Sequence, residues 1–554
     1  MPYLHCVLEL LCKYQGFSLR VLLHYGDDLT LYVCYYRYRF HNIGLYCHYA
    51  GIGVAYGIAG ICLNFCFYFY DGSDNVCANA PSLVILPWGF KVFYAIATDR
   101  FRPFNSRRRV YMKCGWAGAV GCTLILALIG DTCSGTTWLG LSIATQACLM
   151  LADVPADGYS VELGQLEAEN ERGVILSTGQ FIRFLATMFA GVIQATMVNG
   201  ESTNASGCDI SPLNCWSWGL TVGQYYRLLA LIFVVLALPI FFIREVSSDH
   251  IPIHSFAEHG RALWETLKNP TTLFLLIFVS TNAAFTRIAP ITYAYVQYTV
   301  VHLTNLQSGM QVVMIFLAVA IGIQIFQKRF LNRNWRTTLY ISLGLGQAFG
   351  LIWIMVYWNV AGFLNSWYTV LINISQALIV GVCQVLYSMA VIELAQPGQE
   401  AITYEIITSV DNAAFRLNAL ITTQLLTPFD SVICYSGEDG DGACAANQVN
   451  VYSIDAYNDS DGPARFTRYS VVCFGISYVS LILFTPFLPS SKVRKTETLT
   501  YYFLFVRCPH CVVLFVYISK LYDFTHRFLR LNALTGRRVE KRASSTSHAQ
   551  IQLY

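Results

Sequence analysis

The chain has 554 residues, of which 55% are hydrophobic and 12% are charged, and its formal net charge is +3. Soluble domains carry about 25% charged residues, so this composition excludes an ordinary soluble globule, whose surface these few polar residues would not cover. The apolar residues come in blocks of about 20, the length that crosses a bilayer as a helix. The sequence therefore predicts an all-α polytopic membrane protein.

About twelve membrane-spanning helices are expected, in two groups of six. The first group comprises 46–70, 78–98, 112–130, 138–158, 174–198 and 221–243, and the second comprises 272–296, 306–326, 338–358, 366–389, 406–427 and 470–488. The resulting domains are an N-terminal arm (1–45), a six-helix half (46–243), a linker (244–271), a second six-helix half (272–490) and a tail (491–554). This order indicates an internal duplication, and two six-helix halves around a central site are a transporter architecture.

Basic residues collect in the loops that follow the even-numbered spans. The richest of these loops is 99–113, and the segments 244–271, 327–338 and 489–498 are also basic, whereas the opposite loops carry almost no Lys or Arg. Cytoplasmic loops carry the excess of Lys and Arg in membrane proteins, so both ends of the twelve-span unit are predicted to be cytoplasmic. The basic residues set topology, and no nucleic-acid partner is expected.

The two ends of the chain do not fit the twelve-span pattern. Charged residues interrupt the apolar run of the arm, which we interpret as a poorly ordered cytoplasmic segment or a product of incorrect gene prediction. The tail carries an extra apolar block, TYYFLFVRCPHCVVLFVYISKLY, and a basic end. Its CPHC pair has the spacing of a redox centre without the strand and helix context which that chemistry needs. We therefore expect no cofactor and no metal site.

The loop after the second span reads AIATDRFRPFNSRRR. Asp99, Arg100 and the cluster 107–109 resemble the Gly-x-x-x-Asp-Arg-x-Gly-Arg-Arg motif of the major facilitator superfamily, although Ala95 stands at the first glycine. Asp99 is expected to pair with a basic residue of the other half and to hold a cytoplasmic gate shut. The alternative interpretation is ordinary positive-inside charge.

Ionisable residues also occur inside the apolar spans, where each costs roughly 2.5–3.5 kcal/mol and faces a cavity or a partner. The basic ones are Lys91, Arg183, Arg287 and Arg416, and the acidic ones are Asp153, Asp157, Glu162, Glu393, Glu400, Glu405 and Asp411. As a set they favour a functional cavity, and structural ion pairing is the alternative for any single residue. Buried arginine suits an anionic substrate, because a guanidinium binds a carboxylate with two hydrogen bonds.

The stretch LADVPADGYSVE places three carboxylates at the end of the fourth span. Asp153 and Asp157 are four residues apart and share a helix face, and Pro155 between them is expected to distort the helix. Two close carboxylates in a low dielectric do not both ionise easily, so one pKa is predicted to rise and to let that group carry a proton. Glu162, further along, is expected to act as a gate or to anchor the loop.

Three stretches together resemble the folate–biopterin transporter family of the major facilitator superfamily: LPWGFKVFYAIATDRF, LADVPADGYSVE and AQPGQEAITYEIITSVDNAAF. The resemblance covers roughly residues 46–490. It implies uptake of folates or pterins, commonly coupled to protons, although members also carry other small molecules. By this resemblance, the candidates for substrate binding or proton coupling are Lys91, Asp153, Asp157, Arg183 and Arg287. Glu400 and Arg416 are added to them as further charges in the spans. The gate candidates are Asp99, Arg100 and Glu162.

The leading prediction is a proton-coupled carrier of a small organic anion in a lipid bilayer. A receptor or sensor that keeps the carrier fold without flux is the second hypothesis. An enzyme is not expected, since the chain lacks HExxH, GxSxG and GxxxxGK[ST] motifs.

Overall fold

The structure is a computed structural model. It describes residues 22–25, 28–31, 40–70, 80, 83–168, 171–198, 218–243, 260–261, 264, 267–301, 303, 305–395, 399–434, 448–450 and 454–488. The predicted tail and most of the predicted linker lie outside these residues.

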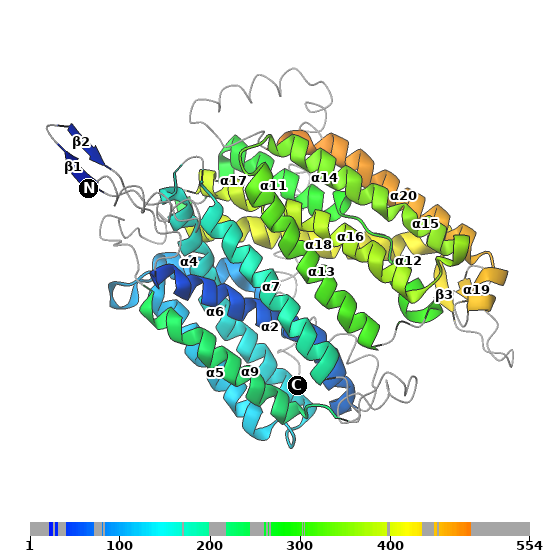
Figure 1. Cartoon of the computed structure of the whole chain (residues 1–554), viewed down its shortest axis with the longest axis horizontal. Helices are drawn as coiled ribbons and strands as arrows, with labels where there is room; N and C mark the ends of the chain where they lie inside the picture. Colours follow the sequence, from blue (N-terminus) through cyan, green and yellow to red (C-terminus); the bar gives the residue numbers. More distant parts are fainter. Residues whose placement is uncertain are drawn as a thin grey trace, which may run out of the picture. The chain divides into compact units, whose positions relative to one another are not determined.

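In the first half, the described residues contain the following helices (Figure 1). They are α2 (Phe40–Tyr70), η1 (Leu86–Phe90) with α4 (Lys91–Arg100), α5 (Arg109–Ile129), α6 (Gly135–Leu166), α7 (Val174–Met197), and α9 (Val222–Ala237) with η4 (Leu238–Phe242); a short turn, η2 (Pro103–Asn105), precedes α5. Helix α2 begins within the range predicted for the arm. That range also holds a hairpin in which β1 (Leu22–Tyr25) pairs antiparallel with β2 (Asp28–Leu31).

The second half also follows the order of its predicted spans. Its helices are α11 (Pro270–Thr281), η5 (Asn282–Thr286), α12 (Thr292–Tyr295), η6 (Val296–Val300), α13 (Asn305–Ile325), η7 (Phe326–Phe330), α14 (Trp335–Gly350), α15 (Ile352–Tyr357), η8 (Val360–Gly362), α16 (Ser366–Gln384), α17 (Leu386–Leu394), α18 (Glu400–Leu426), η9 (Thr427–Phe429), α19 (Ile454–Asp459), α20 (Gly462–Phe484) and η10 (Thr485–Phe487). Strands β3 (Val432–Cys434) and β4 (Gln448–Asn450) pair in parallel. The segments η5, η6 and η7 are π-helical, a geometry that is frequent at functional sites.

In the described part of the chain, eight helices are long and apolar enough to cross a membrane, and Pro270–Thr286 is a shorter apolar helix. Every predicted span overlaps one of the helices above. The all-α membrane class is therefore confirmed, and the total of twelve crossing helices stays a prediction.

Local sequence explains how several helices begin and continue. The Thr221 hydroxyl accepts a hydrogen bond from the backbone N–H of Gln224, whose side chain accepts one from the N–H of Thr221, so both caps of a capping box are present at α9. Ser134 caps α6. Helix α6 continues without a break through Pro155, although proline cannot donate a backbone hydrogen bond. Membrane helices tolerate such a residue where neighbours satisfy the freed groups.

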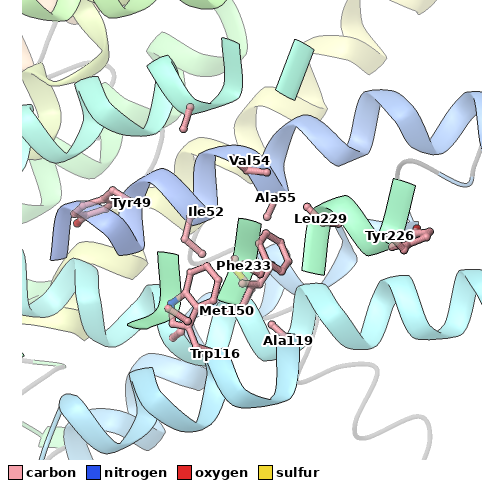
Figure 2. Close-up of a cluster of buried hydrophobic side chains, with 14 of the residues drawn as sticks. Tyr49, Ile52, Val54, Ala55, Trp116, Ala119, Met150, Tyr226, Leu229 and Phe233 are labelled. Carbon is pink, nitrogen blue, oxygen red and sulfur yellow. The ribbon is translucent and has the colours of Figure 1, made fainter. Parts of the chain in front are cut away.

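The core of the first half is apolar and gathers side chains from α2, α5, α6 and α9 (Figure 2), and α2 also packs on α7. Trp116 and Phe233 are fully buried and meet edge to face, with ring centres 5.4 Å apart. A Cβ atom at Gly51 would lie 2.1 Å from the Trp116 ring, and one at Gly53 would lie 2.1 Å from the Arg183 carbonyl oxygen. Glycine is needed at both positions because the neighbouring groups leave no room for a side chain.

Among the described residues, the two halves make their most extensive contacts in two places. Helix α7 packs on α13, where Gly309 faces Ala195 and Gly191 faces Val312; small residues allow such close approach of membrane helices. The beginning of α18 packs on α4 and α6, next to a contact of α17 with α6. This second contact lies at the predicted cytoplasmic end, beside the loop 99–113.

Candidate functional site

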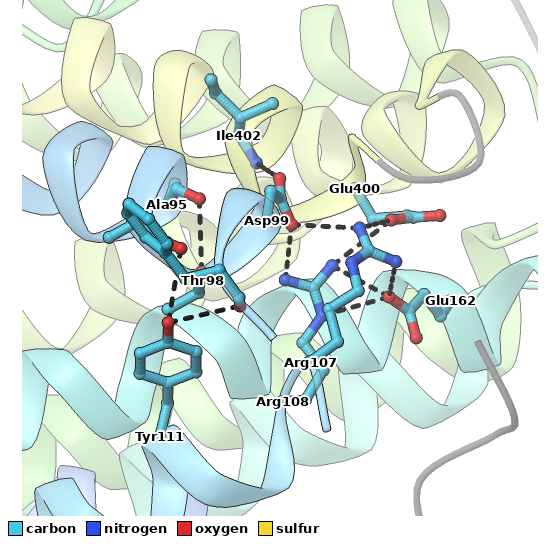
Figure 3. A network of polar contacts seen from close by, with 11 residues as sticks. Ala95, Thr98, Asp99, Arg107, Arg108, Tyr111, Glu162, Glu400 and Ile402 are labelled. Carbon is cyan, nitrogen blue, oxygen red and sulfur yellow. Dashed lines mark hydrogen bonds and ion pairs between the residues drawn. The ribbon is translucent and has the colours of Figure 1, made fainter. Parts of the chain in front are cut away.

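The first polar cluster joins the two halves where α18 begins (Figure 3). It contains Asp99 at the end of α4, Arg107 and Arg108 before α5, Glu162 on α6 and Glu400 at the start of α18. We call these five residues the gate cluster. Glu400 is its member from the second half, so the cluster ties α18 to the first half.

Each gate arginine contacts carboxylates from different helices. Arg107 Nη2 donates to Asp99 Oδ1 at 3.0 Å and to Glu400 Oε2 at 2.7 Å. Arg108 donates to Asp99 at 2.6 Å, to Glu162 at 2.9 Å and to Glu400 at 3.3 Å. Burial disfavours the charge of Arg108, but the adjacent carboxylates outweigh burial and hold the pKa of its guanidinium above the ordinary value. Arg108 therefore stays charged.

The expected pairing of Asp99 with a basic residue of the other half is wrong. Its arginine partners, Arg107 and Arg108, belong to its own half, because the chain folds back after α4 and brings the loop over the helix end. The link from Asp99 to the second half is the backbone N–H of Ile402, which donates to Asp99 Oδ2 at 3.0 Å. Arg100, predicted with Asp99, has its guanidinium 6.0 Å from the Phe101 ring centre.

A second link between the halves lies beside the gate cluster. Gln165 on α6 donates to the carbonyl oxygens of Ala395 at 2.8 Å and Ile392 at 3.1 Å. Arg172, just before α7, pairs with Glu393 on α17 at 3.0 Å. The side chain of Arg172 is 30% exposed, whereas those of the gate arginines are 1–2% exposed.

A second charged cluster lies deeper in the spans. Lys91 precedes Asp99 on α4 by eight residues, a rise of about 12 Å. Its ammonium nitrogen lies 2.8 Å from Asp153, 3.3 Å from Asp157 and 3.5 Å from Glu405, and all three carboxylates are fully buried. Asp153 and Asp157 come from α6, and Glu405 comes from α18.

Arg183 on α7 completes this cluster. Its guanidinium pairs with Asp153 and lies 3.9 Å from Asp157. We call Lys91, Asp153, Asp157, Arg183 and Glu405 the core cluster. Asp153 and Asp157 therefore do not form the isolated acidic pair from which a raised pKa was predicted, since two cations lie among the carboxylates.

Three further side chains complete the surroundings of the two aspartates. His48 on α2 lies with Nε2 3.4 Å from Asp153, and its Nδ1 accepts a hydrogen bond of 2.9 Å from Trp116 Nε1. The hydroxyl of Tyr49 donates to Asp157 Oδ1 at 2.8 Å. His48, Tyr49 and Trp116 are all buried.

Four of the predicted binding or coupling residues meet in the core cluster: Lys91, Asp153, Asp157 and Arg183. Glu400, predicted with them, lies in the gate cluster. Glu405 carried a signal in the sequence, a charge within an apolar span, but was not among the predicted site residues. Nothing in the sequence marked His48 or Tyr49, because an isolated polar residue in a helix does not indicate what it contacts.

The remaining two predicted residues lie in the second half. Arg287, at the end of η5, donates a hydrogen bond to Asp411 on α18, and both side chains are partly buried. Arg416, also on α18, is exposed and forms no ion pair with any residue that the structure describes.

Aromatic rings from both halves stand near Arg416. The ring of Tyr56 lies 5.6 Å from Trp88 and 6.3 Å from Phe316 of the second half, measured between ring centres. Arg183 and Arg416 both lie close enough to interact electrostatically with the Tyr56 hydroxyl. The side chain of Tyr56 is 42% exposed.

No family model and no curated protein matches the chain. Among solved structures, it is similar to a major facilitator superfamily transporter, FucP, in the outward conformation, with a TM-score of 0.50 and 14% identity over 80% of this chain and 99% of that chain. A variant of the E. coli fucose:proton symporter FucP matches with a TM-score of 0.49 and 13% identity over 80% of this chain and 98% of that chain. The chain is thus an integral, multi-pass membrane protein with the major facilitator fold.

Proposed function

We propose that the protein is a proton-coupled secondary transporter of a small organic anion that works by alternating access. The observation that carries this proposal is the core cluster, in which three fully buried carboxylates meet Lys91 and Arg183 within the spans, from four helices and both halves. Ionisable residues are expensive in a membrane and mark substrate or proton paths. The two-half fold supplies the architecture in which such a site is exposed alternately to the two sides.

The contacts between the two halves support a state of the transport cycle in which one end of the protein is closed. The gate cluster and the Arg172–Glu393 pair hold the halves together where α18 begins. Near Tyr56 and Arg416 the side chains are exposed. We propose that this conformation is closed at the predicted cytoplasmic end, and that transport requires the gate cluster to separate.

The substrate is proposed to bind beside the core cluster. Arg416 is a cation without an ion-pair partner in the described part of the chain, so it is available to an anionic group. Tyr56, Trp88 and Phe316 supply aromatic faces close to it, on which a flat ring can stack. A folate-like or pterin-like anion fits this chemistry, and the sequence resemblance is the further reason for choosing it.

The test is uptake of radiolabelled folic acid and biopterin into proteoliposomes that contain the purified chain, with and without an inward proton gradient. We expect accumulation that depends on the gradient and that is lost in Asp153→Asn and Asp157→Asn. Full gradient-driven uptake by both variants would refute their role in coupling. Saturable binding without any flux would instead establish the receptor hypothesis.

A second measurement tests the binding site. Arg416→Gln is expected to weaken binding of folic acid at least tenfold, because a charge-assisted hydrogen bond contributes roughly 1.5–3 kcal/mol. Arg468→Gln is the matched control, since Arg468 is an exposed arginine near the start of α20. Equal affinity in the two variants would exclude Arg416 from the site.

A further inference from the structure

The core cluster has an unequal number of acids and bases. Lys91 and Arg183 contribute two positive charges, and Asp153, Asp157 and Glu405 contribute three negative charges when all are ionised. All three carboxylates have side-chain exposures of 0%. An uncompensated charge in such a place is costly, and a group there takes up a proton rather than remaining charged.

His48 does not supply the missing positive charge. Its Nδ1 accepts the N–H of Trp116 at 2.9 Å, and a nitrogen that accepts a hydrogen bond carries no proton. The single ring proton is therefore on Nε2, which faces Asp153 at 3.4 Å, and the imidazole is neutral. Tyr49 donates its hydroxyl proton to Asp157 and is also neutral.

The three carboxylates differ in how well their negative charges are stabilised. Asp153 lies beside Lys91, Arg183 and His48. Asp157 accepts hydrogen bonds from Lys91 at 3.3 Å and from Tyr49 at 2.8 Å. Both aspartates are therefore stabilised as anions.

Glu405 has the weakest stabilisation of the three. Its Oε1 lies 3.5 Å from Lys91 and accepts no hydrogen bond from any described residue, while Oε2 accepts one from Thr408 at 2.6 Å. The charged groups around it are Lys91 from α4 and the two aspartates from α6, with Arg183 from α7 beyond them. On its own helix, Asp411 is bound to Arg287.

We propose that Glu405 is the proton-carrying residue of the transporter. This inference deepens the proposed function and names a residue that the resemblance did not. Glu405 is the core-cluster member from the second half, and it faces Lys91 of the first half. Deprotonated Glu405 attracts Lys91 and holds α18 against α4, and protonation removes that attraction. The proton therefore acts on the contact that must open during the cycle.

The first test locates the proton without requiring transport. Infrared spectroscopy of the purified protein near neutral pH reports the C=O stretch of a protonated carboxyl group. We expect such a band, and we expect Glu405→Asp to change its frequency and its midpoint pH. The charge-conserving control Asp157→Glu should leave the band's frequency unchanged. A band that changes only in the control, or the absence of a protonated carboxyl band, would overturn the proposal.

Charge-conserving variants are needed because removing any one acid makes the cluster neutral and abolishes the band, whichever group held the proton. Labelling glutamate with ¹³C at the side-chain carboxyl gives an independent reading in the wild-type chain. The band should shift on labelling, and the shift should vanish in Glu405→Asp. A band that does not move belongs to an aspartate and contradicts the proposal.

The second test measures coupling with radiolabelled folic acid as the probe. Glu405→Gln is fixed in the neutral form, so we expect exchange of folic acid across the vesicle membrane to remain while gradient-driven accumulation falls to the equilibrium level. Asp461→Asn, which changes a carboxylate that is 80% exposed, is the control and should accumulate as the wild type does. Accumulation by Glu405→Gln at the wild-type level would overturn the proposal.

The two tests separate this inference from the proposed function. If the wild-type chain moves neither folic acid nor biopterin, the infrared measurement still decides where the proton resides. If Glu405→Gln does not fold, Glu405→Asp keeps the charge and still reports a shifted pH dependence of accumulation. If the pH dependence of accumulation in folded Glu405→Asp is the same as in the wild type, Glu405 is not the proton-carrying residue.

Discussion

The gate cluster and the core cluster contain the same charges in different surroundings. Each has three carboxylates and two cations, and each includes one acid from α18. In the gate cluster every carboxylate accepts a hydrogen bond from an arginine, and Glu162 is 17% exposed. In the core cluster all three carboxylates are fully buried, and Glu405 has one oxygen without a hydrogen bond from a described residue.

The same set of charges can therefore serve two purposes. Arginine, which stays charged, binds several carboxylates at once and suits a contact that holds two elements together. Lysine is a point charge, and three acids share Lys91, so one of these acids is poorly stabilised. In the proposed transport cycle, the gate cluster holds the two halves together and the core cluster takes up the proton. The following predictions test that division.

The largest effect is expected from Lys91→Met. Removing one partner of a buried ion pair costs roughly 3–5 kcal/mol because the remaining charges are left uncompensated, and here three buried carboxylates lose their shared cation. Thermal unfolding in detergent should show the lowest Tm of the variants discussed here. The double variant Lys91→Met with Asp157→Asn removes one cation and one of the two aspartate anions that it pairs with, so it should recover part of the loss. No recovery would contradict the charge count.

A smaller effect is expected from Glu400→Gln at the gate cluster. The N–H of Ile402 lies in the first turn of α18, where no carbonyl of the same helix is available, and it is bonded to Asp99. Weakening the arginine contacts to Glu400 should free this end of α18. Hydrogen exchange of the amides at 400–403 should accelerate roughly tenfold, corresponding to about 1.4 kcal/mol.

Glu171→Gln is the matched control for that measurement. Glu171 lies in the turn before α7, at the same end of the first half, and the structure shows no ion pair for it among the described residues. Equal exchange rates in Glu400→Gln and Glu171→Gln would show that Glu400 does not hold the two halves together.

The smallest effect is expected from Arg172→Gln. Arg172 bridges the halves to Glu393 as the gate arginines bridge to Glu400, but its side chain is 30% exposed. Solvent-exposed ion pairs contribute about 0.2–1 kcal/mol and are screened by salt, and this pair is open to solvent on its Arg172 side. The fall in Tm should be smaller than in the other two variants and should decrease as salt is added. A loss as large as that of Lys91→Met would show that exposure does not separate the two kinds of contact.

Much of this protein was predictable from the sequence because the relevant signals are local. The length and hydropathy of the apolar blocks predicted an all-α membrane protein, and the structure places a helix at each block. The charges within the spans were equally visible, since a carboxylate or an arginine stands out against leucine and valine. The positions of Lys91, Asp153, Asp157 and Arg183 therefore needed no structure, although their mutual contacts did.

The membrane class, the division into helices and the charges within the spans can all be read from the amino-acid sequence. Which of these charges meet depends on the tertiary fold. Asp99 binds arginines of its own loop, Glu400 joins the gate cluster, and Glu405 turns toward Lys91. The physical reason is that spacing along a helix gives the face a residue occupies, while the rotation of that helix against its neighbours depends on packing contacts between segments far apart in the chain.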